Sequence, residues 1–319
     1  MGFDADDEGT VRASGRLPVS VHERELKILF TGAGGFLGRY AAPRLAREHE
    51  VVGTYLNNDV PLDGVRLVRL DLEDAAARAR LLERERPDCV VHAAAMSRPS
   101  DCEADPERAE RVNAGATQWL CASALRLIFF STDLVFDGKH PPYREEDPPA
   151  PSCVYSRLKV DGERAVLART APAMTLRLAL GYGWKPTGHS MFCDSLYRSL
   201  RRGEPMTLFS DQFRSALYMK DAAEILARLL ALREWPEAGG RLLHCGGPES
   251  VSRVRFGREF CSALGLDDSL VEAKTMAEAG VRAAPDCTLK SERLYSLIGF
   301  RPRTIEAGVA DMALENPYK

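Results

Sequence analysis

Tyr155 and Lys159 are the residues whose types and spacing first indicate chemistry. They stand four positions apart in the stretch VYSRLKVDGERAV, and residues at positions i and i+4 of a helix share one face. An ordinary phenol has a pKa of about 10 and exchanges protons poorly at neutral pH. A neighbouring lysine ammonium favours the phenolate and brings the phenol pKa toward the working range. The pair therefore predicts a tyrosine that donates a proton in a carbonyl reduction.

Hydroxyl side chains precede this pair at the end of an apolar run. The run LIFF is followed by Ser131, Thr132 and Asp133. We expect Thr132 to hydrogen-bond the substrate oxygen on which negative charge develops, with Ser131 and Asp133 as further substrate contacts. A Tyr-Lys pair alone is weak support, because a chain with 9 Tyr and 43 Lys plus Arg contains such pairs by chance. The interpretation therefore depends on the rest of the pattern.

A glycine-rich loop, TGAGGFLG at residues 31–38, lies between an apolar strand pattern and a helical pattern. Its glycines allow a tight turn, a close approach to a pyrophosphate and close packing of helix on strand. The helix N-terminus then offers free N–H groups to the anion. A lone glycine cluster also occurs in ordinary tight turns, but the strand-loop-helix context favours a dinucleotide site. The predicted cofactor contacts in this loop are Gly32, Gly35, Phe36, Leu37 and Gly38.

The end of the second strand pattern bears on which nicotinamide cofactor binds. Residues 53–58 read GTYLNN, without the Asp or Glu that grips a ribose 2′-hydroxyl in NAD-specific sites. Arg39 can supply a cation for a 2′-phosphate, although it can equally be an exposed helix residue. We therefore expect NADPH, with NADH as the alternative. Asp71, followed by Leu72, is expected beside the adenine, with helix N-capping as the alternative for Asp71.

Short apolar runs alternate with longer helical patterns from residue 27 to about residue 180. The expected strands are 27–31, 51–55, 65–70, 89–92, 127–131 and 175–180. This alternation is typical of βαβ units, and strands that are apolar throughout indicate helices on both faces of the sheet. The fold class predicted is α/β, a doubly wound parallel sheet with a smaller C-terminal domain. The phosphate loop, the strand that ends in hydroxyl residues and the helix with the Tyr-Lys pair then follow one another along one predicted sheet. Such an order seldom arises by chance.

The domain organisation follows from where this alternation stops. We expect a flexible leader at 1–25, a nicotinamide-dinucleotide-binding Rossmann domain at 26–181 and a mainly substrate-binding domain at 182–319. A further strand at 241–245 is expected to return to the main sheet, so that the boundary is not a single cut. Helical patterns near 252–264 and 290–298 belong to the second part.

Composition excludes several classes of protein. The net charge is -3 and no basic stripe is present, which argues against nucleic-acid binding. No apolar run approaches the roughly 20 residues that span a bilayer, and the first residues are acidic and polar, unlike a signal peptide. The eight cysteines are scattered singly, without metal-site spacing. A cytoplasmic protein with free thiols and no metal is therefore expected.

Several segments together resemble the extended short-chain dehydrogenase/reductases, specifically the dTDP-4-dehydrorhamnose reductase group. They are TGAGGFLG, VVHAAAMSRPSDCE, RVNAGAT, FFSTDLVFDG, PYREEDPPAPSCVYSRLKVDGE and DQFRSALYMKD, within residues 27–303. The resemblance implies NADPH-dependent reduction of a 4-keto-6-deoxy sugar nucleotide. It implies Thr132, Tyr155 and Lys159 as the catalytic group, and Asn113 on a helix supporting the site. It also places further residues beside the cofactor, namely Ala93, Ala94 and Ala95.

On the substrate side the pattern is less specific. Many relatives carry Asn where this chain has Cys153, a site-facing position, so this cysteine is a candidate substrate contact. Trp184 can stack on a flat ring, although tryptophan is often core. Gln212 and Arg214 lie in the block that resembles the substrate-side loop, and arginine can pair with phosphate.

Two alternatives to the sugar-nucleotide reductase stay open. The first keeps the chemistry but reduces a non-sugar carbonyl in specialised metabolism, which the change at Cys153 permits. The second is a non-catalytic protein, because the regulatory subunit of methionine adenosyltransferase resembles the same framework, including a YREED-like segment. The intact Thr132, Tyr155 and Lys159 favour an enzyme. The partner expected is a small-molecule substrate, a nucleotide sugar, and a homodimer is compatible with the sequence.

Overall fold

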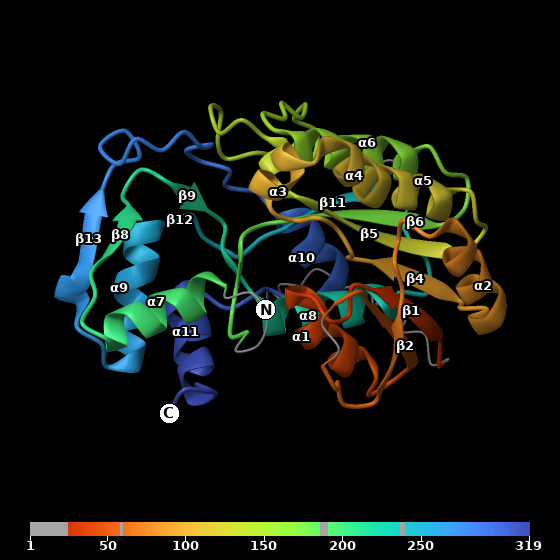
Figure 1. Cartoon of the computed structure of the whole chain (residues 1–319), viewed down its shortest axis with the longest axis horizontal. Coiled ribbons are helices and arrows are strands. Elements are labelled where there is room, and N and C mark those ends of the chain that lie inside the picture. Colours follow the sequence, from red (N-terminus) through yellow and green to blue (C-terminus); the bar gives the residue numbers. More distant parts are fainter. Residues whose placement is uncertain (1–24, 58–59, 186–190, 237–239) are drawn as a thin grey trace, which may run out of the picture.

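The central feature of the fold is a parallel sheet with helices on both faces (Figure 1). The computed structural model describes residues 25–57, 60–185, 191–236 and 240–319. The predicted leader at 1–25 therefore falls outside the described residues, apart from Glu25. Seven strands pair in the order β11-β6-β5-β4-β1-β2-β3, each parallel to its neighbour. This confirms the prediction of a doubly wound α/β sheet.

The strands of this sheet are short and largely buried. Their bounds are β1 (Lys27–Thr31), β2 (Glu50–Tyr55), β3 (Val65–Arg69), β4 (Cys89–His92), β5 (Arg126–Thr132), β6 (Ala173–Leu178) and β11 (Leu242–Cys245). The predicted bounds of β1 and β4 match those observed, and the other four strands predicted between residues 27 and 180 differ by at most two residues at each end. Continuous apolar runs identify these strands well because helices cover both faces.

Two groups of helices enclose the sheet (Figure 1). On one face pack α1 (Phe36–Leu45), α8 (Met219–Leu230) and α10 (Glu292–Ile298). On the other face lie α2 (Ala75–Glu85), α3 (Pro99–Ala104), α4 (Pro106–Ala109), α5 (Ala116–Cys121) and α6 (Val154–Leu167). A π-helical segment, η1 (Glu110–Gly115), joins α4 to α5. No helix in the part of the chain that the structure describes is long and apolar enough to cross a membrane.

A second apolar core lies beside the sheet, at the left of Figure 1. It contains α7 (Phe192–Arg201), α9 (Arg253–Leu264) and α11 (Ile305–Leu314), with three two-stranded pairs. The pairs are β7 (Gly181–Tyr182) with β10 (Leu217–Tyr218), β9 (Phe213–Arg214) with β12 (Val251–Ser252), and β8 (Met206–Phe209) with β13 (Val271–Lys274). Strand β11 pairs with the main sheet, and α8 and α10 pack against it. Since these elements alternate along the chain with those of the second core, the chain passes between the two cores repeatedly. The division at residues 181 and 182 stays a prediction.

The sheet order determines where a ligand binds. Connections run from β1 outward to β2 and β3, and then from β4 outward in the opposite direction. The C-terminal ends of β1 and β4 therefore border a crevice at the switch point, where open α/β sheets bind their ligands.

Two buried histidines give the fold a testable acid sensitivity. His92 and His244 are 1% and 0% exposed, and burial lowers the pKa of each from 6.5 to about 3. The unfolded chain takes up these protons near pH 6.5 and the native protein only near pH 3. Stability should therefore fall as the pH is lowered through this window, by about 2 kcal/mol per histidine between pH 7 and pH 5.

Urea unfolding at pH 7 and pH 5 measures this loss of stability. His92→Gln or His244→Gln should reduce the difference between the two pH values, because one titrating group is removed. The exposed His140 provides the matched control, since His140→Gln should leave the difference unchanged. Equal pH dependence in all three variants and the wild type would contradict the assignment.

Candidate active site

Tyr155 and Lys159 lie on the inner face of α6, against the C-terminal end of β5. Both are buried, with 7% and 3% of their surface exposed. The Lys159 ammonium donates a hydrogen bond of 2.8 Å to the carbonyl oxygen of Phe130. The helix approaches the strand closely because Gly162 faces Phe129, where an added Cβ would lie 2.7 Å from the ring. The predicted pair therefore shares one helix face and points toward the end of the strand.

Thr132 lies where sequence analysis places it, beside the Tyr155 hydroxyl. A side-chain hydrogen bond with Thr132 lowers the Tyr155 pKa, but burial, followed by the charge of Asp133, raises it well above the ordinary value. In the protein alone the phenol pKa is therefore not brought toward the working range, because desolvation of the phenolate is the largest effect. A phenol that holds its proton at neutral pH is suited to donate it.

Lys159 shows the opposite effect of burial on a cation. Desolvation lowers the pKa of its ammonium to about 8, and the carboxylate of Glu163 raises it again in part. The Lys159 Nζ atom lies 4.8 Å from the Phe129 ring centroid and 6.0 Å from that of Tyr155. The pKa of Lys159 therefore lies close to physiological pH, so nearby charges decide how much of the lysine is protonated.

The glycine loop has the geometry that its sequence predicts. Gly32 has φ of 78°, and a Cβ there would lie 2.8 Å from the backbone of Ala94. Gly35 is the N-cap of α1 and provides no side-chain cap, so the first N–H groups of the helix stay available. A Cβ on Gly38 would lie 2.5 Å from the Cα atom of Ala33. The loop, the helix and the end of β4 are thus in close backbone contact.

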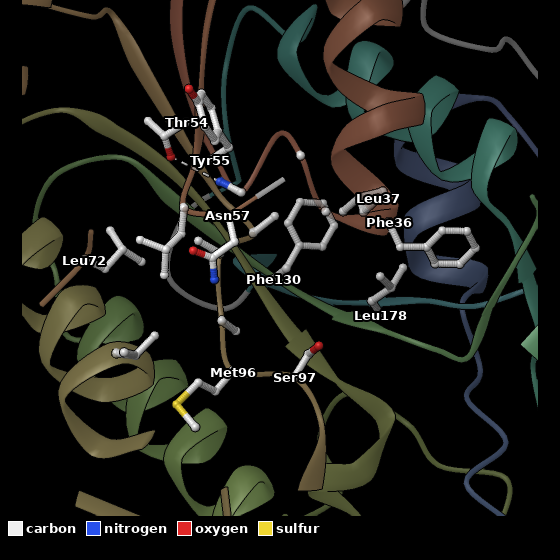
Figure 2. Close-up of a pocket in the computed structure, with 18 of the residues that line it drawn as sticks. Phe36, Leu37, Thr54, Tyr55, Asn57, Leu72, Met96, Ser97, Phe130 and Leu178 are labelled. Atoms are coloured by element: carbon white, nitrogen blue, oxygen red, sulfur yellow. Dashed lines mark hydrogen bonds between the residues drawn. The ribbon is translucent and has the colours of Figure 1, made fainter. Parts of the chain in front are cut away.

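A cavity of about 500 Å³ lies above this loop, and Tyr155 and Lys159 also line it. Figure 2 shows part of its lining, including Phe36, Asn57 and Phe130. Most of the predicted cofactor contacts line it: Gly32, Gly35, Phe36, Leu37, Asp71, Leu72, Ala93, Ala94, Ala95, Tyr155 and Lys159. Ser131 lines it too, together with residues that sequence analysis did not single out, namely Thr54, Asn57, Met96, Ser97, Phe130 and Leu178. The loop, the ends of β1, β2, β4 and β5, and α6 thus line one cavity, an arrangement that suits a dinucleotide.

The remaining cofactor predictions have distinct positions. Gly38 lies beneath the loop rather than on the cavity wall. Arg39 Nε donates to the carbonyl oxygen of Gly34 at 3.3 Å, so its guanidinium borders the loop. Its contact with a 2′-phosphate stays a prediction. Asp71 lines the cavity, and the N-cap of α2 is Asp74, which argues against the capping alternative for Asp71.

Asn113 holds the cavity wall from the π-helical segment. Its side chain accepts a hydrogen bond from Met96 N at 2.8 Å and donates one to Met96 O at 3.0 Å. These two bonds fasten the segment after β4 to the helix layer. Asn113 therefore supports the site without lining the cavity, in keeping with the resemblance.

A cluster of polar side chains lies next to the Thr132–Asp133 segment, on the side that faces the second core. Arg214 Nε is 3.6 Å from Asp133 Oδ2, and Arg214 also donates to the carbonyl oxygens of Phe213, Ala284 and Pro285. Gln212 Oε1 accepts from Arg253 Nε at 3.0 Å. Burial and the charge of Arg214 lower the pKa of Arg253 to about 10. The structure therefore brings Asp133, Gln212 and Arg214 together and adds Arg253, which sequence analysis missed.

Two residues predicted on the substrate side, Trp184 and Cys153, make contacts within the protein. Trp184 is 7% exposed, its Nε1 donates to the carbonyl oxygen of Met312 at 2.8 Å, and its ring packs among Tyr197, Phe260 and Tyr318. A side chain enclosed in this way cannot stack on a ligand, so this prediction is not retained. Cys153 is the N-cap residue of α6, where its backbone N–H donates to Ser156 Oγ at 3.1 Å. Its contact with substrate stays a prediction.

Comparison with known proteins matches the chain to one family over almost its whole length. The family model described as the RmlD substrate binding domain matches residues 26–316. A probable low-salt glycan biosynthesis reductase from Haloferax volcanii is 32% identical over 80% of this chain and 85% of its own. A probable dTDP-4,6-dihydroxy-2-methyloxan-3-one 4-ketoreductase from Streptomyces antibioticus is 34% identical, over 86% and 87%.

A non-reductase name also occurs among the relatives. Methionine adenosyltransferase 2 subunit beta from Rattus norvegicus is 29% identical over 87% of this chain and 84% of its own. Among solved structures, dTDP-4-dehydrorhamnose reductase from Bacillus anthracis in complex with NADP superposes with a TM-score of 0.78. It covers 92% of this chain and 100% of its own at 22% identity, which supports the fold.

Proposed function

The chain belongs to the RmlD substrate binding domain family, and on this basis we propose that it catalyses the NADPH-dependent reduction of a keto group on a nucleotide-linked 4-keto-6-deoxy sugar. The observation that carries the proposal is the single cavity that joins the phosphate loop to Tyr155 and Lys159. A binding protein needs only the loop, whereas a buried, protonated phenol at the far end of the same cavity can supply the proton that carbonyl reduction requires.

The residues of the chain divide the work along this cavity. Gly32 and Gly35 let the backbone approach a pyrophosphate closely, and the first turn of α1 offers it N–H groups. A bound NADPH supplies the hydride. Tyr155 donates the proton to the carbonyl oxygen, and Thr132 beside it stabilises the charge that develops on that oxygen. Lys159 places a positive charge at the reacting end, which favours transient phenolate formation on Tyr155.

The proposed substrate class is supported by the similar proteins and by the polar side chains next to the Thr132–Asp133 segment. A reductase relative at 34% identity acts, by its name, on a dTDP-linked keto sugar. In this chain Arg214 and Arg253 lie beside Asp133, where cations suit the diphosphate of a nucleotide sugar. The choice of NADPH rests on the GTYLNN segment and on the NADP in a structural neighbour, with NADH as the alternative.

Turnover with a panel of ketones tests this function. NADPH consumption is measured with dTDP- and UDP-linked 4-keto-6-deoxy sugars, with the matching free sugars, and with simple ketones, and is repeated with NADH. We expect turnover with a nucleotide-linked sugar only, faster with NADPH. The same nucleotide sugar should raise the melting temperature in the presence of NADPH. Faster turnover of a non-sugar ketone would support the reductase of specialised metabolism instead.

A partner-binding function is the second candidate, supported by the likeness to methionine adenosyltransferase 2 subunit beta. The retained Thr132, Tyr155 and Lys159 favour turnover over binding alone. Co-purification of this chain with a methionine adenosyltransferase, together with no NADPH consumption on any ketone in the panel, would favour the partner function.

A further inference from the structure

A buried ion pair lies directly behind the catalytic helix, and the proposed function does not use it. Glu163 on α6 and Arg177 on β6 are 3% and 2% exposed. Two hydrogen bonds join them, from Arg177 Nε at 2.9 Å and from Arg177 Nη2 at 2.8 Å. Burying two charges is costly, and well-packed apolar residues would often serve stability as well. The position of the pair therefore invites a functional explanation.

The pair is placed at the strand ends that form the site. Ser131, Arg177 and His244 are direct neighbours across β5, β6 and β11. Ser131 Oγ donates to Glu163 Oε1 at 2.6 Å, and Arg177 Nη1 lies 3.3 Å from His244 Nε2. Glu163 thus fastens α6 to the strand end next to Thr132, one helical turn beyond Lys159.

Among the described titratable groups around Lys159, Glu163 is the one that carries a negative charge acting on the lysine. The ammonium is bonded to a backbone carbonyl and lies near two aromatic rings, all uncharged. His92 on β4 is neutral at working pH, because burial holds its pKa near 3. Burial also raises the pKa values of Cys102 on α3 and of Tyr155, so both stay protonated. Asp133 faces Arg214, at 3.6 Å.

We propose that Glu163 is a positioning residue that keeps Lys159 charged and, through Ser131, holds the strand end that carries Thr132. Arg177 fixes the carboxylate in this place and balances part of its charge. The inference rests on the proposed function, because it concerns the charge that the cavity offers to NADPH and to Tyr155. A polyanionic cofactor binds more weakly when a cation that lines its cavity becomes neutral.

The sign of the pH effect follows from the lysine. Its pKa is near 8 in the wild type, so NADPH affinity and kcat/KM should fall as the pH rises through that value. Without the Glu163 carboxylate the Lys159 ammonium loses its proton more easily. The fall in NADPH affinity and in kcat/KM should then occur at lower pH. Removal of one nearby opposite charge shifts a pKa by about one unit, which corresponds to about tenfold weaker NADPH binding above pH 8.

The test uses Glu163→Gln combined with Arg177→Gln, because the single change would leave a buried arginine unpaired. NADPH binding is followed by nicotinamide fluorescence across pH, with circular dichroism to verify folding, and kcat/KM is measured in parallel. The matched control is Asp161→Asn with Arg164→Gln, which removes an ion pair from the solvent face of the same helix. We expect the high-pH fall to move down in the first variant, by less than about one pH unit because the balancing Arg177 charge is removed too, and to stay in place in the control.

A second variant covers the case in which the double change does not fold. Glu163→Asp keeps the charge but withdraws it by one methylene, so the fall should move in the same direction by a smaller amount. A folded variant of either kind with the wild-type pH profile would overturn the inference and leave the proposed function intact. A wild type that neither binds NADPH nor reduces any ketone would overturn both.

Discussion

Replacing Tyr155 by Phe should lower kcat by about 10²–10⁴-fold while the affinity for NADPH changes little. The phenylalanine keeps the ring that packs against α3 and η1 but lacks the hydroxyl hydrogen-bonded to Thr132. The reducing end of the cavity would then lack its proton donor. Steady-state NADPH consumption gives kcat, and fluorescence titration of NADPH gives the affinity.

The control for this variant is a buried tyrosine remote from the cavity. Tyr197 is 8% exposed and stacks on Tyr318 in the second core. Tyr197→Phe should retain full turnover, which separates loss of the donor from a general effect of losing a phenol. Equal kcat for Tyr155→Phe and the wild type would show that another group donates the proton.

Replacing Gly32 by Ala should weaken NADPH binding by about 100-fold, the equivalent of one or two lost charge-assisted hydrogen bonds. The added Cβ would lie 2.8 Å from the backbone of Ala94, and φ of 78° is unfavourable for alanine. The loop must move, and its N–H groups no longer face the pyrophosphate. NADPH titration measures the loss.

Gly203 provides a control that isolates the contact from the backbone strain. It also has positive φ, at 71°, but no atom of the described residues lies within 4 Å of an added Cβ. Gly203→Ala should therefore cost about 1–3 kcal/mol of stability and leave NADPH affinity unchanged. If both variants weakened binding to the same degree, the close approach of the loop to Ala94 would not be the cause.

Local patterns in the sequence predict the dinucleotide half of the site well. The strand bounds of β1 and β4 are correct, because continuous apolar runs are typical of strands buried on both faces. The spacing of Gly32, Gly35 and Gly38 predicts the loop, since each glycine has its own steric reason. Tyr155 and Lys159 share one helix face because helical periodicity places them there.

The missed features depend on contacts between distant parts of the chain. The π-helical segment at Glu110–Gly115 presents Asn113 to Met96, and no local pattern signals such a segment. Arg253 looks like an ordinary residue at the start of a helix until Gln212 and Arg214 come beside it. Trp184 follows a strand at the ligand edge, but the C-terminal helix α11 covers it and makes it core.

The most direct test of the central claim follows the transferred hydrogen. NADPH that carries deuterium at its transferable position is incubated with the chain and a dTDP-linked 4-keto-6-deoxy sugar, and the product is examined by mass spectrometry and NMR. We predict one deuterium on the former carbonyl carbon, in a single configuration, with wild-type protein and almost none with Tyr155→Phe. Oxidation of NADPH without deuterium in the sugar, or no oxidation with any nucleotide sugar, would contradict the proposed function.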